Sequence, residues 1–277
     1  MKPHRSWFYG LSAVVTGASD GMGRIIAEKL ITVFGCRVIG IARSADKLIN
    51  VKNGLGDLSG RFEYIAADVS DAAFWKDLGA RLIRENSTVD ILINNAGVMP
   101  PFIPLRDTAE EVFERTTDVN YKAVYYSIKN LLPVLKKSRS AGIVNVSSAA
   151  ALCPLAGTAV YSASKAAVKS LTEAFAAEEK DIYVSFVCPG FTKTNLFRDT
   201  GNFFESRLIS FLSSSAEKAA GRILKGMEKR KKRIIIGSDA KTLRAFHKLA
   251  PSLSAPVVLA VMKASGMEIF DELCKKQ

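Results

Sequence analysis

Residues 16–23 read Thr16-Gly17-Ala18-Ser19-Asp20-Gly21-Met22-Gly23, a glycine-rich turn between two apolar patterns. The short apolar run Ser12–Val15 precedes the turn, and Arg24–Phe34 follows it with apolar side chains at helical spacing. Glycines let the backbone turn sharply and approach a ligand, and a helix N-terminus offers free N–H groups and a positive dipole end to a pyrophosphate. A strand, a glycine turn and a helix in this order therefore predict the first unit of a dinucleotide-binding α/β domain. The spacing Gly-x3-Gly-x-Gly differs from the common Gly-x-Gly-x2-Gly, and a turn without a ligand is the alternative.

Outward from this turn, apolar runs alternate with helical patterns along the whole chain. We predict strands at Ser12–Val15, Arg37–Ile41, Arg61–Ala66, Val89–Ile93, Gly142–Val146, Ile182–Val187 and Arg233–Ile236. The helical patterns between them include one long helix over about Thr108–Lys137 and an alanine-rich helix over Thr158–Glu179. Strict alternation, with strands apolar on both faces, is typical of a parallel sheet covered on two sides. The predicted fold class is α/β: residues 1–277 form a single doubly wound Rossmann-type domain of about seven parallel strands with helices on both faces.

The composition excludes several classes of protein. The 277 residues, of which 48% are hydrophobic, can bury a sizeable core, and no apolar run approaches the roughly 18 residues of a membrane span. Only two histidines are present, His4 and His247, which disfavours a Ser-His-Asp hydrolase and most catalytic zinc sites. The four cysteines form no Cys-x2-Cys pair, so we expect no metal site and a reducing, cytoplasmic location.

The net charge of +12 is compatible with nucleic acid, an anionic membrane surface or phosphorylated small molecules as partners. The densest basic run, Lys229–Arg233, lies between a helical pattern and an apolar triplet, and we interpret it as a solvated turn. No motif of a nucleic-acid-binding domain accompanies it. We therefore expect no nucleic-acid partner.

Three side chains near the fifth predicted strand suggest chemistry on a carbonyl group. Tyr161 and Lys165 lie four residues apart on a predicted helix and so share a face. An ammonium beside a phenol favours the phenolate and lowers a pKa that is otherwise about 10. Tyr161 would then give a proton to a carbonyl oxygen or take one from an alcohol, and Ser148 would hydrogen-bond the same oxygen.

The chain contains a second pair with the same spacing, Tyr125 and Lys129. The spacing alone therefore does not identify a catalytic pair. Tyr161 follows the fifth predicted strand, whose carboxyl end carries Ser147-Ser148, whereas Tyr125 lies within the long predicted helix. We therefore assign the chemistry to Tyr161.

Four motifs between residues 16 and 194 together resemble the classical short-chain dehydrogenase/reductase family. They are the turn Thr16–Gly23, the run Asn94-Asn95-Ala96-Gly97, the Tyr161-x3-Lys165 pair with Ser148 upstream, and Pro189-Gly190 with Thr194. The resemblance implies an oxidoreductase with a nicotinamide cofactor and the catalytic residues Asn120, Ser148, Tyr161 and Lys165. It also implies that the cofactor is bound by Gly17, Ser19, Asp20, Gly21, Met22, Gly23, Arg43, Ser44, Asp68, Val69, Asn95, Ala96, Gly97, Tyr161, Lys165, Pro189, Gly190, Thr192 and Thr194.

The same resemblance gives two further expectations. Asn120 would hold a water molecule that links Lys165 to solvent, with a capping or kink role as the alternative. Members of the family usually form dimers or tetramers through the helices that hold Asn120 and Tyr161, so we expect a homodimer or a homotetramer.

The end of the second strand bears on the choice of cofactor. An acidic residue about 20 residues beyond the glycines binds the ribose 2′-OH of NAD(H), but here Ala42 is followed by Arg43. A guanidinium group can hold a 2′-phosphate with two hydrogen bonds, so we predict NADP(H). Asp20 is a counter-argument, because some NADP-type relatives carry a basic residue there. Asp68-Val69 resembles the family's adenine-binding position, with a helix N-cap as the competing or additional role of Asp68.

The residues after Thr194 suggest the nature of the substrate. A substrate lid is predicted near residues 195–215, since this segment contains Leu196, Phe197, Phe203, Phe204, Leu208, Ile209, Phe211 and Leu212. Core packing is the alternative. Apolar walls are also expected from Val98, Met99, Phe102, Leu152 and Leu155. The predicted substrate is an apolar carbonyl compound or alcohol: steroid-like, acyl-chain or aromatic.

The C-terminal extension, residues 238–277, contains the apolar stretches Leu243–Leu249 and Val257–Met262 among basic residues. It is either a pair of packed, subunit-contacting helices or an amphipathic segment at a membrane surface. We favour packing over membrane association.

The sequence thus predicts an NADP(H)-dependent oxidoreductase. A catalytically silent NADP(H)-binding regulator or scaffold is the alternative, and an epimerase or dehydratase on the same fold is a third. Because Ser148, Tyr161 and Lys165 are all present, the first is favoured.

Overall fold

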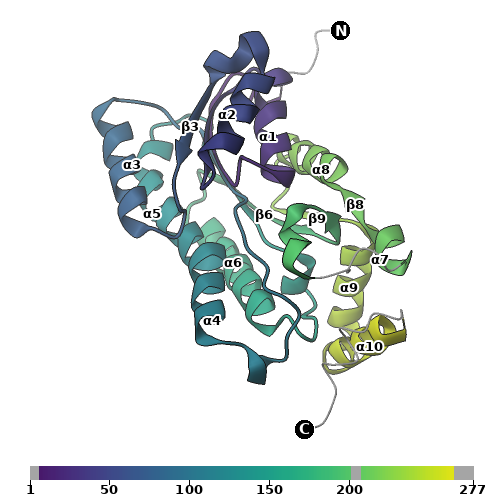
Figure 1. The fold of residues 1–277 in the computed structure, drawn as a ribbon. Coiled ribbons are helices and arrows are strands. Elements are labelled where there is room, and N and C mark those ends of the chain that lie inside the picture. The colour runs from purple at the N-terminus through teal and green to yellow at the C-terminus, as the bar shows by residue number, and fades with distance from the viewer. Residues whose placement is uncertain (1–5, 201–206, 265–277) are drawn as a thin grey trace.

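The computed structural model describes residues 6–200 and 207–264, and its centre is a seven-stranded sheet (Figure 1). The strands run in the order β3-β2-β1-β4-β5-β6-β9, and every neighbouring pair is parallel. Their bounds are β1 Ser12–Thr16, β2 Arg37–Ala42, β3 Phe62–Ala66, β4 Ile91–Asn94, β5 Gly142–Val146, β6 Tyr183–Pro189 and β9 Arg233–Ile236. This confirms the predicted doubly wound parallel sheet. The prediction placed the start of β4 two residues early, at Val89, and ended β6 two residues short of Pro189.

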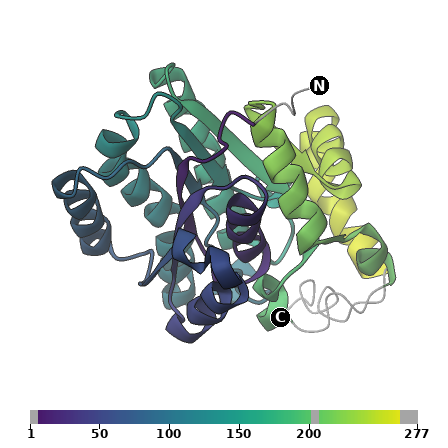
Figure 2. The same cartoon turned by 90° about the horizontal axis from the view of Figure 1, so that it is seen from above.

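Helices cover both faces of the sheet (Figure 2). On one face lie α1 (Gly21–Thr32), α2 (Ala45–Gly54) and α8 (Ala216–Glu228), whose apolar side chains join one core cluster with β1 and β2. On the other face, α3 (Ala72–Arg84), α5 (Ala123–Leu135) and α6 (Ala159–Glu178) form a second cluster. The clusters contain Ile26 and Leu30 on the first face and Trp75 and Leu131 on the second, all fully buried. The strands, which are apolar on both faces, are therefore covered by helices on both faces.

The order of the strands reverses between β1 and β4, which are hydrogen-bonded neighbours although two strands and three helices separate them in the sequence. Connections leave the carboxyl ends of these two strands toward opposite faces, so a crevice opens there. Ligands of open α/β sheets bind at this switch point.

The long helix predicted over Thr108–Lys137 is wrong in one respect, because it is interrupted. An α-helix, α4 (Glu110–Thr117), passes into a π-helical segment at Asp118–Lys122 and then into α5. The wider segment contains Asn120, whose side chain turns inward to bond the backbone of Val98. Such π segments concentrate at functional sites.

Short elements follow β6 that the sequence pattern did not predict. Strands β7 (Thr192–Lys193) and β8 (Ser214–Ser215) pair as a separate two-stranded sheet. Between them lie a 3-10 turn, Asn195–Thr200, and the helix α7 (Arg207–Leu212). Residues 201–206 of the predicted lid, with Phe203 and Phe204, lie outside the described residues. Other 3-10 turns are Gly56–Arg61, Leu105–Asp107 and Ala149–Ala151.

The chain continues through two helices, α9 (Ser238–Leu249) and α10 (Pro251–Ala264), and residues 265–277 of the extension lie outside the described residues. The basic run leads from the end of α8 into β9: Arg230 stacks on the Trp7 ring and Arg233 pairs with Glu173. Within residues 6–200 and 207–264, no helix combines the length and apolarity needed to cross a membrane.

Candidate active site

A cleft of about 540 Å³ lies at the carboxyl ends of the strands, around the switch point between β1 and β4. Its size is that of a small-molecule site. Every residue predicted to bind the cofactor lines it except Gly23, and so do the predicted catalytic residues Ser148, Tyr161 and Lys165. The structure thus brings together side chains that are up to 177 positions apart, from Gly17 to Thr194.

The glycine turn is shaped for close approach. Gly17 and Gly21 have φ angles of +67° and +52°, which favour glycine over other residues. Gly23 packs inward, where an added Cβ would overlap the Gly17 carbonyl oxygen and the Asn95 amide. The first turn of α1, with Gly21 and Met22, faces the cleft and leaves backbone N–H groups for an anion. A dinucleotide pyrophosphate fits this cradle.

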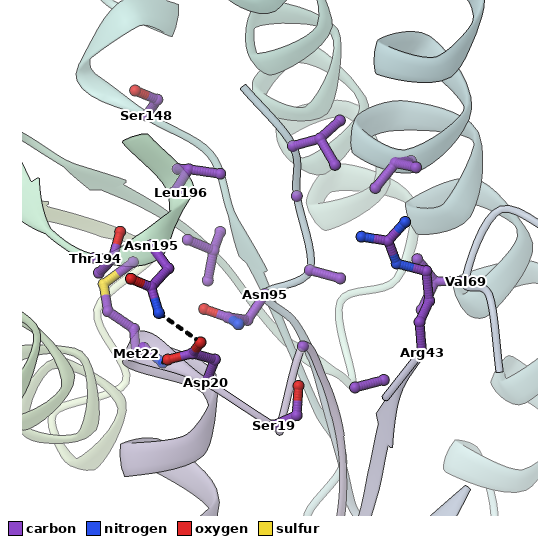
Figure 3. A pocket seen from close by; sticks show the side chains of 18 of the residues that line it. Ser19, Asp20, Met22, Arg43, Val69, Asn95, Ser148, Thr194, Asn195 and Leu196 are labelled. Atoms are coloured by element: carbon purple, nitrogen blue, oxygen red, sulfur yellow. Dashed lines mark hydrogen bonds between the residues drawn. The ribbon is translucent and has the colours of Figure 1, made fainter. Parts of the chain in front are cut away.

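Asp20 is the N-cap of α1 and accepts a hydrogen bond from the Gly21 amide at 2.7 Å. Its second oxygen accepts from Lys47 Nζ at 3.1 Å and from Asn195 Nδ2 at 2.7 Å (Figure 3). Burial raises the pKa of Asp20, but the hydrogen bonds from Asn195 and Lys47 outweigh it and hold that pKa below its usual value. Sequence reasoning missed both partners. They matter because the charge of Asp20, the counter-argument against NADP(H), is balanced by a lysine.

The adenosine end of the cleft carries cationic groups. Arg43 and Lys47 both line it, and Ser44 caps α2 by accepting from the Lys47 amide at 3.3 Å. Figure 3 shows Arg43 and Val69 among the side chains that line the cleft. No acidic side chain occupies the end of β2, where Ala42 lies.

Asp68 is held in place by a second arginine. Its carboxylate accepts from Arg115 Nη2 at 3.0 Å and from Ser70 N and Oγ at 2.9 and 2.6 Å. Burial raises the pKa of Asp68, and the hydrogen bonds from Ser70 and Arg115 lower it to below its usual value. The N-cap of α3 is Asp71, so the capping role considered for Asp68 is wrong. Arg115 was also missed.

Tyr161, Lys165 and Ser148 meet where the floor of the cleft turns toward the C-terminal helices. Tyr161 and Lys165, one turn apart on α6, are each 4% exposed. Lys165 Nζ lies 5.9 Å from the centre of the Tyr161 ring and donates to the Val146 carbonyl at 3.2 Å. Ser148 hydrogen-bonds with Tyr161, whereas its neighbour Ser147 turns away and donates to the Lys165 carbonyl at 2.7 Å.

The pKa of the phenol moves opposite to the sequence-based expectation. Burial raises the pKa of Tyr161 to about 12, although the hydrogen bond with Ser148 acts to lower it. Burial also lowers the pKa of Lys165 to about 8. Both shifts have the same origin, since a low-dielectric interior disfavours the charged form of each group. Tyr161 is therefore a phenol that stays protonated well above neutral pH and can act as a proton donor.

Asn120 lies behind the cleft and is fully buried. Its Oδ1 accepts from Val98 N at 2.8 Å, and its Nδ2 donates to Val98 O at 2.9 Å and to Ser164 Oγ at 3.0 Å. A Cβ added at Gly97 would lie 3.1 Å from both Asn120 Oδ1 and Lys165 Nζ. The Asn120 side chain thus fixes the loop after β4 beside Lys165. The predicted role of Asn120 in holding a water molecule stays a prediction.

Asn94 is likewise part of the frame: its Nδ2 donates to Asn145 Oδ1 at 2.8 Å, and its Oδ1 accepts from Ser127. The second Tyr-x3-Lys pair lies on the surface of α5, where Tyr125 is 43% exposed and outside the cleft. Among the described residues, no cluster of histidine, cysteine and carboxylate side chains could hold a metal ion.

A small apolar cavity of about 30 Å³ adjoins the cleft and shares Ser148, Tyr161, Gly190 and Phe197 with it. The predicted walls Met99, Phe102 and Leu155 belong to the cluster around Tyr161, with Phe191, Ile209 and Met262, whereas Leu152 and Val98 do not.

One charged residue that sequence reasoning missed, Asp239, also lines this cavity. Asp239 is 6% exposed, and its Oδ2 accepts from the Phe191 amide at 2.6 Å. The carboxylate fills the space that a side chain at Gly190 or Gly237 would need. Burial raises its pKa. Its position just after the carboxyl end of β9 is the signal that could have identified it.

Fold and cleft together define a Rossmann-type protein with a dinucleotide site beside an apolar cavity. A family model described as short chain dehydrogenase matches residues 12–203. A 3beta-hydroxysteroid dehydrogenase 2 of Eggerthella lenta is 29% identical over 196 residues, which cover 70% of this chain and 75% of the relative. A short-chain dehydrogenase structure from Streptomyces avermitilis is 30% identical with a TM-score of 0.75, and the match covers 88% of this chain and 95% of that one.

A further solved structure, a short chain dehydrogenase/reductase from Burkholderia phymatum in complex with NAD, has a TM-score of 0.79 at 23% identity, with 90% and 96% of the two chains covered. It shows the same fold. The chain belongs to the short-chain dehydrogenase/reductase family, as the motifs predicted, and is an oxidoreductase that acts on alcohol or ketone groups.

Proposed function

We propose that the chain is an NADP(H)-dependent oxidoreductase that interconverts an apolar ketone or aldehyde and its alcohol. The observation that carries this proposal is the position of Ser148 and Tyr161, which line both the dinucleotide cleft and the apolar cavity. A carbonyl group in that cavity would meet two hydroxyl groups at the boundary between the sites.

The chain's own contribution is proton supply and orientation. When bound, the nicotinamide supplies or accepts the hydride. Tyr161, a phenol that burial keeps protonated well above neutral pH, donates its proton to the carbonyl oxygen. Ser148 donates a hydrogen bond to the same oxygen and stabilises its developing charge. Lys165, one turn away, favours the phenolate that remains. In the direction of alcohol oxidation, the same groups act in reverse.

The preference for NADP(H) rests on Arg43, Ser44 and Lys47 at the adenosine end of the cleft. The Arg43 guanidinium and the Ser44 hydroxyl group suit a 2′-phosphate, whereas Lys47 is shared with the carboxylate of Asp20. A carboxylate that would repel the phosphate is missing from the end of β2. The Burkholderia phymatum neighbour was solved with NAD, which supports a nicotinamide cofactor in general; the choice of NADP(H) depends on this chain's Arg43.

The apolar substrate is supported by Met99, Leu155 and Phe191, which surround the cavity. The Eggerthella lenta relative is named for a hydroxysteroid. The cavity of about 30 Å³ has room only for the part of such a substrate next to the carbonyl group, and the rest would lie in the adjoining cleft. We also propose a cytoplasmic homodimer or homotetramer, with the exposed Phe113 of α4 at the subunit contact.

The decisive experiment measures NADPH oxidation with a panel of steroid-like, acyl-chain and aromatic ketones, comparing the wild type with Tyr161→Phe. The substitution should lower kcat by about 10²- to 10⁴-fold, the usual contribution of a positioned proton donor. Tyr125→Phe, in the surface pair of the same spacing, is the matched control and should keep full activity. Equal rates for wild type and Tyr161→Phe would defeat the catalytic assignment, and activity on hydrophilic sugars alone would defeat the apolar cavity.

A second experiment tests the cofactor. Arg43→Gln should weaken NADPH binding by about 10- to 100-fold, the effect of losing charge-assisted hydrogen bonds, and leave NADH binding nearly unchanged. Arg37→Gln, at the opposite end of the same strand and exposed, is the control. A wild type that binds NADH more tightly than NADPH would contradict the preference.

A further inference from the structure

Helix α10 is apolar on both of its faces, yet only one face is covered. On the inner face, Val258, Leu259 and Met262 pack against the cluster that contains Tyr161. On the outer face, Leu253, Val257 and Val261 are 59%, 44% and 51% exposed. These three residues recur every four positions and form one stripe along the helix.

The row beside this stripe is also exposed and, apart from Ser252 at its start, apolar: it contains Pro256, Ala260 and Ala264. A helix that is apolar all round is normally buried all round. The outer face of α10 therefore points to a partner that covers it.

The charge pattern of helix α9 indicates the kind of partner. Lys241, Arg244 and Lys248 are exposed and lie three and four positions apart, so they share one face of α9. The single acidic residue of Ser238–Ala264 is Asp239, which is buried under the Gly190 turn. The exposed part of the two helices thus carries positive charge without negative charge.

The basic and the apolar stripes belong to one structural unit. A single residue, Ala250, joins α9 to α10, and His247 Nδ1 lies 2.7 Å from Ser254 Oγ across the junction. Leu249, at the end of α9, is 85% exposed beside the start of α10. The inner face of α10 packs on the apolar cluster, and the outer surfaces of the two helices combine lysine and arginine with branched aliphatic side chains.

We propose that α9 and α10 dock on the surface of an anionic lipid bilayer, with the outer face of α10 in the boundary between headgroups and acyl chains and the α9 stripe on the headgroups. Basic residues beside an exposed apolar helix face are the pattern of interfacial helices. A second copy of this chain is a poor occupant, because it would bring a second set of unbalanced positive charges to the same contact. The inference is independent of the proposed function, and packing, the interpretation favoured from the sequence, describes only the inner face.

Taken together with the proposed function, on which it rests, the position of this surface has a functional consequence. Leu243 of α9 lines the apolar cavity, and the inner face of α10 packs on the apolar cluster beside it, so docking would place that cavity near the lipid from which an apolar substrate partitions.

The test is flotation of the full-length protein with phosphatidylcholine vesicles that do or do not contain phosphatidylglycerol. We expect binding to the anionic vesicles, with weaker binding to the neutral ones and at high salt. The variant Leu253→Ser/Val257→Ser/Val261→Ser and the variant Lys241→Gln/Arg244→Gln/Lys248→Gln should each reduce partitioning at least tenfold, since each basic residue contributes about fivefold.

Matched controls remove the same side-chain types elsewhere. Val33→Ser/Ile49→Ser/Ile83→Ser deletes three exposed apolar residues, at the C-cap of α1, on α2 and on α3. Lys76→Gln/Arg84→Gln/Lys180→Gln deletes three exposed cations. Circular dichroism and NADPH binding check that all variants are folded. Failure of the wild type to bind anionic vesicles overturns the proposal, as do controls that lose as much binding as the test variants. A wild-type dimer that the α10 variant alone converts to monomers, by light scattering, would instead identify a second copy as the occupant.

Discussion

The two regions that flank the cleft are built from different interactions. The nucleotide side is held by polar contacts of fixed geometry: Thr16 Oγ1 accepts from the amides of Asn95 and Ala96 at 2.9 and 3.0 Å, and Asn94 and Asn145 bond across neighbouring strands. The substrate side is held by apolar contacts among Phe191, Ile209, Met262 and their neighbours.

The difference teaches where each region tolerates change. A buried polar network needs particular atoms at particular distances, because every unpaired donor or acceptor costs free energy. An apolar cluster needs volume and shape, which many sequences supply. Substitutions on the nucleotide side should therefore either abolish binding or leave it intact, whereas substitutions on the substrate side should change activity by degrees.

The largest effect is expected from Gly23→Ala. A methyl group there would overlap the Gly17 carbonyl oxygen and the Asn95 amide, both on the nucleotide side, so the turn has to move. We expect loss of measurable NADPH binding and a decrease of about 3 kcal/mol or more in the free energy of unfolding, at the upper end for overpacking. Isothermal titration and urea denaturation measure the two quantities.

Gly221→Ala in the interior of α8 is the control, because nothing lies within 4 Å of the added methyl group. It should stabilise the protein by about 0.5–1 kcal/mol, the difference in helix propensity. A Gly23→Ala protein that binds NADPH normally would show that the nucleotide side tolerates graded change after all.

The next effect concerns Lys165, whose pKa is about 8 in the folded chain and 10.5 ordinarily. Between these values the unfolded chain binds more protons than the folded one, so this group makes stability rise with pH from about 8 toward 10.5. Lys165→Met removes the buried ammonium. The variant should be more stable than the wild type below pH 8, by up to about 3 kcal/mol, and should lose this advantage as the pH approaches 10.

Urea denaturation of both proteins at pH 7 and pH 9.5 measures the difference directly. The surface lysine of the second pair gives the control, Lys129→Met, which should show no such pH dependence. If Lys165→Met and the wild type differ by the same free energy at both pH values, the burial of Lys165 does not determine its pKa.

The same contrast explains what the sequence could predict. The parallel sheet and the cleft were predictable because strands that are apolar on both faces and residues such as Gly17, Ser148 and Tyr161 are constrained locally, by backbone geometry or by spacing. Lys47 and Arg115 were not, since they reach Asp20 and Asp68 from helices 27 and 47 positions away. The sign of the Tyr161 pKa was missed because spacing shows a neighbouring charge but not the depth of burial.

Asp239 joins the two regions and should have an intermediate effect. Its carboxylate, at the start of α9, holds the Phe191 amide next to the Pro189-Gly190 turn of the cleft. Asp239→Ala leaves that buried amide without an acceptor, at a cost of about 1–3 kcal/mol in the free energy of unfolding. We expect weaker NADPH binding as well, because the turn that lines the cleft loses its anchor.

Asp239→Asn separates the hydrogen bond from the charge. It keeps an oxygen acceptor for the Phe191 amide and should recover most of the loss seen in Asp239→Ala, by denaturation and by the KM for NADPH. Equal losses in both variants would mean that the negative charge, and not the acceptor, holds the two regions together.

The smallest and most graded effect is expected on the substrate side, from Met99→Ala. Met99 is 6% exposed and lines the cavity of about 30 Å³ between Leu155 and Tyr161. Shortening it enlarges the cavity without touching a hydrogen bond, so the ratio of kcat/KM for a bulky over a small ketone should rise by about tenfold, as for a change of one or two methylene groups in an apolar pocket. The KM for NADPH should stay within about twofold if the two sides are independent. A Met99→Ala protein whose cofactor affinity falls along with its substrate selectivity would contradict the division, since it would show that the apolar contacts also set the geometry of the nucleotide cleft.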